Sequence, residues 1–570
     1  MIVKFNNKII LLTLFTLTSC NPNLNDSDSF EKSKLIPEEV LNANVEIDIL
    51  FDKQAEGYDT YTDIGKYDKP IEYVELFRFF SAAKEFNKIA PNVKINLFTS
   101  ENKGDYVYKK GHQPHLIVIG DSVNTIIPSN YIIDGSVTDL SRYADAIYFK
   151  KYNDNIVNSF NFGGFQLAFP LQFDPYGVFV NLDHLQEGKV VSEVLTNGLC
   201  SEEYKEYVDN FTYDSFVDSV RKTTTATHVG LDYLNTLIPN LSLDNFYSSI
   251  VKNNNIDLDG KEAIVQTTKL LECENELSKY CLYEYGTIGY RYKDQFFNAA
   301  PWNVKKNFII DKYSTFSAEF PWNLSTISYY AKQNSVEFNL DYLPYPKIDG
   351  TSSFKSGVSA TGVAVGNLCP IGLSGAERCY SSNAKLEMDV ASYFAMFMSI
   401  DPRAHNAYYE MRTTNNEKGV PLLPLVEKNI AVDLQNDFNI SSDFDDLFNY
   451  QLSYYLQNND LLITDDKLPD VVNYTNVKYG FAKVLNTIYG ENPTAIYLNH
   501  TPSLNIMSWS KRYHNSESIE GSVGTDSYVT TILSKLDRIE KDLNYQIDDY
   551  WLNIQNGLDK NYGKNKYKVI

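Results

Sequence analysis

The segment Val45-Glu-Ile-Asp-Ile-Leu-Phe51, together with the residues that follow it up to Asp121, decides the fold. Its apolar side chains alternate, which predicts a β-strand. The stretch Val93-Lys-Ile-Asn-Leu-Phe98 alternates again, and Leu116-Ile-Val-Ile119 is continuously apolar. Between the first two strands a helix is predicted, because five apolar residues recur at helical spacing: Val74, Phe77, Phe80, Ala83 and Phe86. Strand, helix, strand and buried strand in this order predict a doubly wound α/β lobe.

The third predicted strand ends in Gly120 and Asp121. In open α/β sheets, ligands bind outside the carboxyl ends of the strands. We therefore predict that Asp121 contacts a ligand. The alternative is that its side chain caps a following helix.

The mixed pattern returns from about residue 165 to 320 and predicts a second lobe. Beyond residue 384 the periodicity is helical, with one shared face formed by Met388, Ala391, Phe394 and Phe397. A long amphipathic helix is predicted at the far end by Ile532, Leu536, Ile539, Leu543, Ile547, Trp551 and Ile554.

The first residues resemble an export signal. Lys4 and Lys8 precede the apolar run from Ile9 to Leu17, which is too short to span a bilayer. Leu17-Thr-Ser-Cys20 resembles the lipobox of bacterial lipoproteins, which implies that Cys20 carries lipid and anchors the protein to the outer face of the cytoplasmic membrane. An ordinary secretory signal is the alternative. The polar residues 21–43 predict a flexible tether.

The composition is that of a globular, acidic protein. The hydrophobic content is 43% and the formal net charge is −22. This charge repels nucleic acid and anionic lipid headgroups, so neither is an expected partner. The 43 tyrosines suit polyhydroxylated ligands, because each offers an apolar face and a hydroxyl group. A biased codon pool explains the same enrichment.

The cysteines predict no zinc or redox motif. Cys273 and Cys281 are eight residues apart and Cys369 and Cys379 are ten apart, spacings that allow two local disulfides in an exported protein. Cys200 would then be left over, and the alternative is that all five cysteines beyond Cys20 stay reduced. We expect no metal site and no cofactor.

Seven segments, in the correct order, resemble the family 1 extracellular solute-binding proteins of bacterial ABC importers, the maltose-binding type. They cover roughly residues 45–425. His115 and Val180 depart from the family pattern, and the last 145 residues or so match it only in being helical. The segments are 86–95 (Phe-Asn-Lys-Ile-Ala-Pro-Asn-Val-Lys-Ile), 114–121, 164–181, 213–216 (Tyr-Asp-Ser-Phe), 320–323 (Phe-Pro-Trp-Asn), 343–347 (Leu-Pro-Tyr-Pro-Lys) and 359–365.

The resemblance implies a two-lobed periplasmic-binding-protein-like α/β fold of type II, with an interlobe cleft and a helical C-terminal part. We expect a hinge of two or three strands, with chain crossings near residues 150–170 and 315–350. The expected domains are a signal peptide (1–20), a tether (21–43), a first lobe (44–160 with 325–400), and a second lobe with C-terminal helices (161–324 with part of 401–570).

The implied function is to capture a solute, expected to be a mono- or oligosaccharide, and to deliver it to an ABC permease as a monomer. Trp322 falls on a family position that supplies a stacking platform, and its alternative role is burial in the lobe. The other expected ligand contacts are Asp121, Phe173, Asp174, Tyr176, Thr361, Gly362 and Trp302. Pro175 gives Phe173, Asp174 and Tyr176 an alternative role in shaping a turn.

Catalytic motifs fail on inspection. Gly372-Leu-Ser-Gly375 is not a nucleophile elbow, and Pro114 prevents His112 and His115 from presenting a helical zinc motif. We therefore predict that the protein is not an enzyme. A surface glycoside hydrolase and an adhesin are the rival hypotheses, because the 73 acids include many candidate carboxylate pairs.

Overall fold

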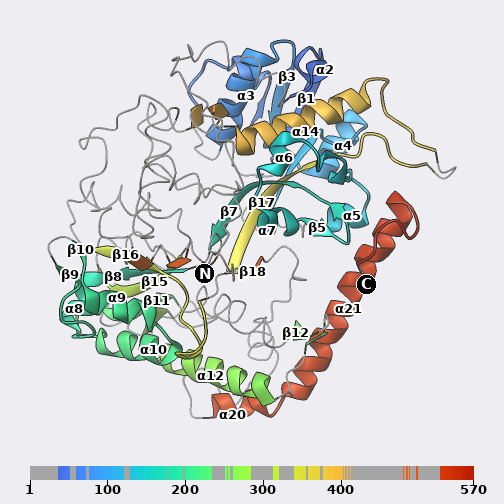
Figure 1. Cartoon of the computed structure of the whole chain (residues 1–570). Helices are drawn as coiled ribbons and strands as arrows, with labels where there is room; N and C mark the ends of the chain where they lie inside the picture. The colour runs from blue at the N-terminus through green and yellow to red at the C-terminus, as the bar shows by residue number, and fades with distance from the viewer. Residues whose placement is uncertain are drawn as a thin grey trace, which may run out of the picture.

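The computed structural model describes residues 36–51, 59–71, 76–120, 129–175, 177–196, 199–233, 261–283, 312–319, 339–354, 357–372, 376–401 and 527–569. It also describes single residues and pairs within 251–256, 308, 403–411 and 479–497. The described residues form two lobes, each with its own sheet and apolar core (Figure 1).

The first sheet has the strand order β18-β17-β4-β1-β3-β2, with β7 also paired to β17. Strand β1 runs parallel to β3 and β4, whereas β17 runs antiparallel to β4 and β7. The three strands predicted from alternation and apolar runs are therefore confirmed. The strands are β1 (Glu46–Leu50), β2 (Thr60–Tyr61), β3 (Lys94–Phe98), β4 (Leu116–Ile119), β7 (Phe169–Pro175), β17 (Gly357–Val365) and β18 (Ile496–Tyr497).

Helices cover both faces of this sheet. Helix α3 (Phe77–Ile89) packs with α14 (Ala384–Ile400), and the Phe86 ring centroid lies 5.2 Å from that of Phe394 and 5.4 Å from that of Phe397. Helix α4 (Lys103–Lys110) covers the other face, where Tyr106 packs on Leu50 and Phe98. The predicted helical faces are thus confirmed for Phe77, Phe80, Ala83 and Phe86 in α3 and for the four residues of α14, whereas Val74 lies outside the described residues.

Shorter elements complete this lobe. Helix α2 places Ile36 and Val40 in the first core, so the ordered body begins before residue 44 and the predicted tether was too long at its end. The elements are α2 (Glu38–Leu41), η1 (Ile64–Lys66), α5 (Asn130–Ile133), η3 (Ser141–Tyr143), α6 (Ile147–Lys150), α7 (Asp154–Asn158), β5 (Asn161–Phe162) and β6 (Phe165–Gln166).

The second sheet has the order β14-β11-β15-β8-β16. Its strands are β8 (Gly177–Asn181), β11 (Val229–Tyr233), β14 (Cys281–Tyr283), β15 (Ser314–Glu319) and β16 (Leu340–Leu343). Around it lie α8 (Leu182–Glu187), α9 (Glu202–Asp209), α10 (Tyr213–Lys222) and α12 (Lys261–Leu277), and the short strands β9 (Leu195–Thr196) and β10 (Leu199–Cys200). The short strands β12 (Val251–Lys252) and β13 (Asn255–Ile256) pair with each other, and β13 contacts the C-terminal helix.

The chain passes between the sheets where β7 leads into β8 and where β16 leads back to β17. Strand β7 pairs with β17 in the first sheet, and β16 pairs with β8 in the second. The first lobe therefore extends past the expected limit at residue 160 to include β7, because β7 is paired in the first sheet. The second lobe likewise extends past the expected limit at residue 325 to include β16, because β16 is paired in the second sheet.

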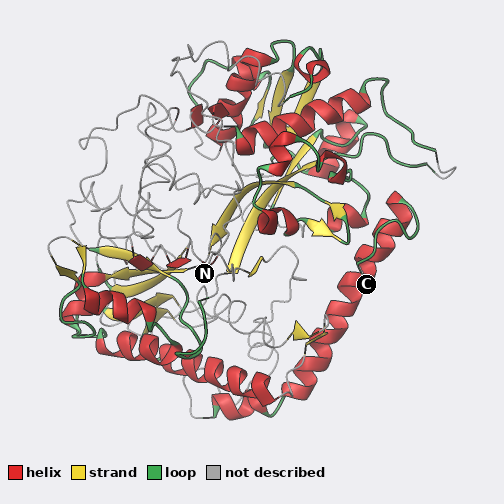
Figure 2. Cartoon of the chain, in the orientation of Figure 1, coloured by secondary structure: helices red, strands yellow, loops and turns green. Residues whose placement is uncertain are grey.

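The C-terminal helices α20 (Tyr528–Leu533) and α21 (Leu536–Tyr562) join the two lobes (Figure 2). Ile539 and Ile547 belong to the second core, whereas Ile554 and Leu558 belong to the first. Gly557 permits the close approach of α21 to α5, since a Cβ atom there would lie 2.6 Å from the Ile133 Cα. The expected helical C-terminal part packed across both lobes is confirmed, although the predicted long helix is divided: Ile532 lies in α20, which a turn at 534–535 separates from α21.

The two possible disulfides have different outcomes. Cys369 and Cys379 are bonded, but Cys273 and Cys281 keep their thiols. The spacing therefore allowed one disulfide that forms and one that does not. Both of these side chains are buried in the second core, where the Cys281 thiol donates to the Ser278 carbonyl at 3.4 Å and burial raises the pKa of Cys273 above its usual range.

The predicted signal peptide and Cys20 lie outside the described residues. Within the part of the chain that is described, no helix has the length and apolar character needed to cross a membrane.

Candidate functional site

The carboxyl end of β4 lies against the return strand β17. Gly362 is the ladder partner of Ile119, and the next residue, Gly120, has a φ of 150°. A Cβ atom at Gly120 would lie 2.8 Å from the Thr361 Cα, so glycine is needed for this approach. The chain then enters the segment with Asp121, which lies outside the described residues.

Three of the predicted ligand contacts lie together where β7 meets β17. Phe173 is paired with Ala360 and Gln172 with Thr361, and the register shifts between Thr361 and Gly362. A shift of this kind bends a strand, which suits a strand that runs out of one lobe toward the other.

These three residues are packed closely. Phe173 is fully buried, Thr361 is 5% exposed, and a Cβ atom at Gly362 would lie 2.8 Å from Ala168 and Phe160 atoms. Thr361 and Gly362 have ladder neighbours in β7, and Gly362 also in β4. The structure thus gives them a packing role at the junction, and their contact with a ligand stays a prediction.

The remaining predicted contacts are not placed. The backbone of Asp174 is paired with that of Ser359 in the ladder, but the structure does not describe the Asp174 side chain. Tyr176, Trp302 and Trp322 lie outside the described residues. The structure therefore positions the backbone that leads to the predicted site and leaves most of its side chains as predictions.

The second lobe contributes a buried polar pair that the sequence analysis missed. Ser317 of β15 donates to Asp232 of β11 with an oxygen–oxygen distance of 2.6 Å. Asp232 is next to the carboxyl end of β11, the kind of strand end at which α/β sheets bind ligands. The signal was an acid inside the otherwise uncharged segment Val229-Gly-Leu-Asp-Tyr233.

A second polar network lies under α4. Asp48 accepts hydrogen bonds from the Tyr106 hydroxyl at 2.6 Å and from the Asn96 amide at 2.6 Å, and the same amide donates to Glu46 at 2.7 Å. Burial and the adjacent Asp48 carboxylate raise the pKa of Tyr106 above its usual range. Asp48 is only 3% exposed, and both of its carboxylate oxygens accept hydrogen bonds. The pair of carboxylates Asp48 and Glu46 therefore stabilises the lobe and does not resemble an open hydrolase site.

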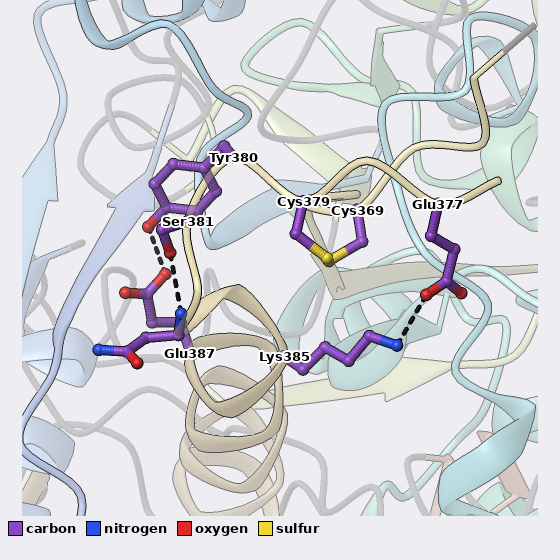
Figure 3. Close-up of a disulfide and its surroundings, with 8 residues drawn as sticks. Cys369, Glu377, Cys379, Tyr380, Ser381, Lys385 and Glu387 are labelled. Atoms are coloured by element: carbon purple, nitrogen blue, oxygen red, sulfur yellow. Dashed lines mark hydrogen bonds and ion pairs between the residues drawn. A yellow bond between two sulfur atoms is a disulfide. The ribbon is translucent and has the colours of Figure 1, made fainter.

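The network continues to the disulfide loop (Figure 3). His115 Nδ1 accepts from the Asp48 backbone N–H at 3.0 Å, and its Nε2 lies 3.5 Å from a Glu387 oxygen. Burial alone would raise the pKa of Glu387, but hydrogen bonds from His115 and Tyr380 hold it below its usual value.

The neighbours of the His115–Glu387 pair (the dyad) limit the chemistry that it can perform. Tyr380, which follows Cys379, donates to Glu387 and lies 3.4 Å from His115 Nε2, and its ring stacks on His112. The described polar and ring contacts of the His115 side chain are to Asp48, His112, Tyr380 and Glu387, none of which is a serine, threonine or cysteine nucleophile. The dyad therefore ties the loop to the first sheet.

One group of described side chains could hold a metal ion, although the sequence suggested none. His184, Glu187 and His228 bring one ligand atom each within 4.8 Å of one another. Burial, and to a smaller extent His228 and Lys312, lower the pKa of His184 to about 3, and burial lowers the pKa of His228.

The fold matches solved structures of solute-binding proteins. A chitin oligosaccharide binding protein aligns with a TM-score of 0.50 and 10% identity, over 88% of this chain and 99% of that chain. A periplasmic solute binding protein from Pectobacterium atrosepticum aligns with a TM-score of 0.49 and 12% identity, over 88% and 100%. The sugar-binding protein MalE from Xanthomonas citri aligns with a TM-score of 0.48 and 9% identity, over 89% and 99%.

No protein-family model matches the sequence, and the search of curated proteins gives no match. At these identities the structural likeness establishes the fold alone. The predicted fold class, a two-lobed periplasmic-binding-protein-like α/β fold of type II with a helical C-terminal part, is confirmed.

Proposed function

We propose that the protein is the substrate-binding lipoprotein of an ABC importer, which binds a mono- or oligosaccharide between its lobes and delivers it to the membrane permease. The observation that carries this proposal is the double crossing at β7 and β17, which joins two separately cored α/β lobes at the strand ends where such sheets bind ligands. The shared fold with a chitin oligosaccharide binding protein supports a carbohydrate as the solute.

Binding would work through lobe closure and needs no catalytic group or cofactor. A ligand that contacts both lobes favours the closed state, because only differential affinity for the two states shifts their equilibrium. In this proposal, the first lobe offers Asp121 and the junction offers Asp174 and Tyr176, while Trp322 and Trp302 supply apolar stacking faces. The boundary between the proposed lobes lies at the two chain crossings, from β7 to β8 and from β16 to β17. The closed protein, as a monomer, binds the permease.

A carbohydrate panel tests the proposed solute. A sugar at about 100 times its Kd stabilises the folded state by about 2.7 kcal/mol, so the matching sugar is expected to raise the melting temperature. Trp322→Ala is expected to abolish that shift, whereas Tyr545→Ala, which removes an exposed aromatic side chain of α21, should leave it intact. If a peptide or polyamine raises the melting temperature and no sugar does, the carbohydrate assignment is wrong.

The lipid anchor is tested separately at Cys20. Cys20→Ala is expected to release the protein from the membrane fraction or to leave the precursor uncleaved, since the cysteine would carry two-chain lipid, which gives stable anchoring. The measurement is membrane fractionation with metabolic labelling by a radioactive fatty acid. Unchanged membrane retention with unchanged labelling would contradict the anchor.

A further inference from the structure

We propose that His184, Glu187 and His228 form a binding site for a divalent transition-metal ion, of which Zn²⁺ is the expected occupant. The site lies in the second lobe and is independent of the proposed sugar site. His184 and Glu187 are three residues apart on α8, and His228 directly precedes β11. An ion bound here would join α8 to the start of β11.

The two histidines are already paired. Their rings are stacked, with centroids 3.8 Å apart and an interplanar angle of 14°. Both side chains are buried, at 5% exposure for His184 and 4% for His228. The His228 Nε2 atom is buried and has no hydrogen-bond partner among the described residues, so a donor or ion is needed to satisfy it.

The other nitrogen of each ring is held by hydroxyl groups. His184 Nδ1 lies 3.3 Å from the Thr315 Oγ1, and His228 Nδ1 lies 3.2 Å from the Oγ1 atoms of both Thr225 and Thr227. Metal-bound histidines usually donate their second N–H to an outer acceptor, which fixes the ring and its tautomer. The hydroxyl groups can accept these N–H bonds and leave each Nε2 available to an ion.

Glu187 supplies a negatively charged ligand beside the two imidazoles. Its side chain is exposed at the end of α8 and acts electrostatically on His228, whereas the cation Lys312 acts on His184. Two imidazoles and a carboxylate suit Zn²⁺, with a water as fourth ligand, whereas Ca²⁺ and Mg²⁺ prefer oxygen ligands. Ligand atoms on Zn²⁺ lie about 3.4 Å apart when bonds are about 2.1 Å, so the group, now within 4.8 Å, has to contract. The two stacked rings also have to turn relative to each other, because the lone pairs of parallel rings do not converge on one ion.

The site lies away from the hinge. Strand β8 begins at Gly177, beside the crossing, and ends at Asn181, where α8 begins. Figure 1 shows α8 at the edge of the second lobe, far from β7 and β17. The ion would therefore brace the outer end of the second sheet and would not contact a solute held between the lobes.

The test uses the full mature protein after treatment with a chelator, titrated with Zn²⁺ in competition with a chromophoric chelator. The expected result is one equivalent of tightly bound Zn²⁺ and a rise in melting temperature, with no response to Ca²⁺ or Mg²⁺. Co²⁺ should give the intense visible bands of a tetrahedral site. Glu187→Gln changes an exposed side chain, so it should fold normally and weaken Zn²⁺ binding at least tenfold, and His184→Gln should weaken it further.

His112→Gln is the matched control, because His112 belongs to a histidine pair with ring centroids 5.4 Å apart in the first lobe. This variant should bind Zn²⁺ like the parent protein. Absence of stoichiometric Zn²⁺ binding, or binding that Glu187→Gln and His184→Gln leave unchanged, would overturn the proposal.

Discussion

Replacing Asp401 by Asn is expected to lower the free energy of unfolding by roughly 3 kcal/mol at pH 7, because it breaks a buried ion pair by removing one partner. The Asp401 side chain is 4% exposed and accepts from Arg403 Nε at 2.8 Å, from Arg403 Nη2 at 2.7 Å and from the Tyr148 hydroxyl at 2.6 Å. The variant leaves the Arg403 charge only a quarter exposed and without its counterion.

The same substitution predicts a pH dependence. Burial alone would raise the pKa of Asp401, but the Arg403 and Tyr148 hydrogen bonds outweigh it and hold the pKa below its usual value. A carboxyl whose pKa is lower in the folded than in the unfolded state stabilises the protein at every pH above the unfolded-state pKa, which is about 4. This contribution is lost as the pH falls through the folded-state pKa. The deficit of Asp401→Asn should therefore shrink below about pH 4.

Urea unfolding from pH 7 to about 2 measures both effects, because this range extends below the unfolded pKa of the carboxyl. Asp145→Asn is the matched control, because Asp145 forms an ion pair with Lys150 at 3.1 Å and its side chain is fully exposed. This control should leave stability unchanged. A deficit in Asp401→Asn that stays constant across this pH range would show that the ionised carboxylate is not its cause.

Replacing Ile554 by Ala in α21 is expected to cost about 2–5 kcal/mol of unfolding free energy, since the side chain is fully buried in the first core. Leu552→Ala removes an exposed apolar side chain two residues earlier in the same helix and should change stability by less than about 0.5 kcal/mol. Thermal and urea unfolding compare the two variants. Equal losses would mean that α21 does not pack on the first lobe as described.

Helix α21 also connects the cores of the two lobes. Helix α21 contributes Ile547 to the second core and Ile554 to the first, and Trp551 packs against both. Any change in the angle between the lobes must therefore be accommodated by α21 as well as by β7 and β17.

The fold was predictable where residues repeat with a clear period. The apolar residues of 45–51 and 93–98 indicated β1 and β3, and the phenylalanines of α3 and α14 indicated two helices with a buried face. The alternation in the two strands does not mean that one face is exposed, because the intervening Asp48 and Asn96 are buried as well. The crossings were less predictable. Strands β7 and β16 mix apolar with polar residues in a pattern that fits either sheet, and only the ladder pairing decides which lobe holds them.

The site was predictable only in part, because proximity between distant residues leaves no local pattern. The stacking of His184 on His228 joins residues 44 positions apart through the fold of the second lobe, and neither has a metal-binding spacing. In the same way, Asp232 meets Ser317 across two paired strands. The spacing of Cys273 and Cys281 allowed a disulfide that does not form, because the helix α12 and the strand β14 place the two thiols separately in the core.

The central claim is that the lobes close on a carbohydrate, and small-angle X-ray scattering of the mature protein tests it most directly. The measurement compares the protein alone with the protein saturated by the sugar that raises its melting temperature. The account predicts a smaller radius of gyration with that sugar, and no change in Trp322→Ala at the same concentration. A sugar that binds tightly and leaves the radius of gyration unchanged would contradict capture by lobe closure.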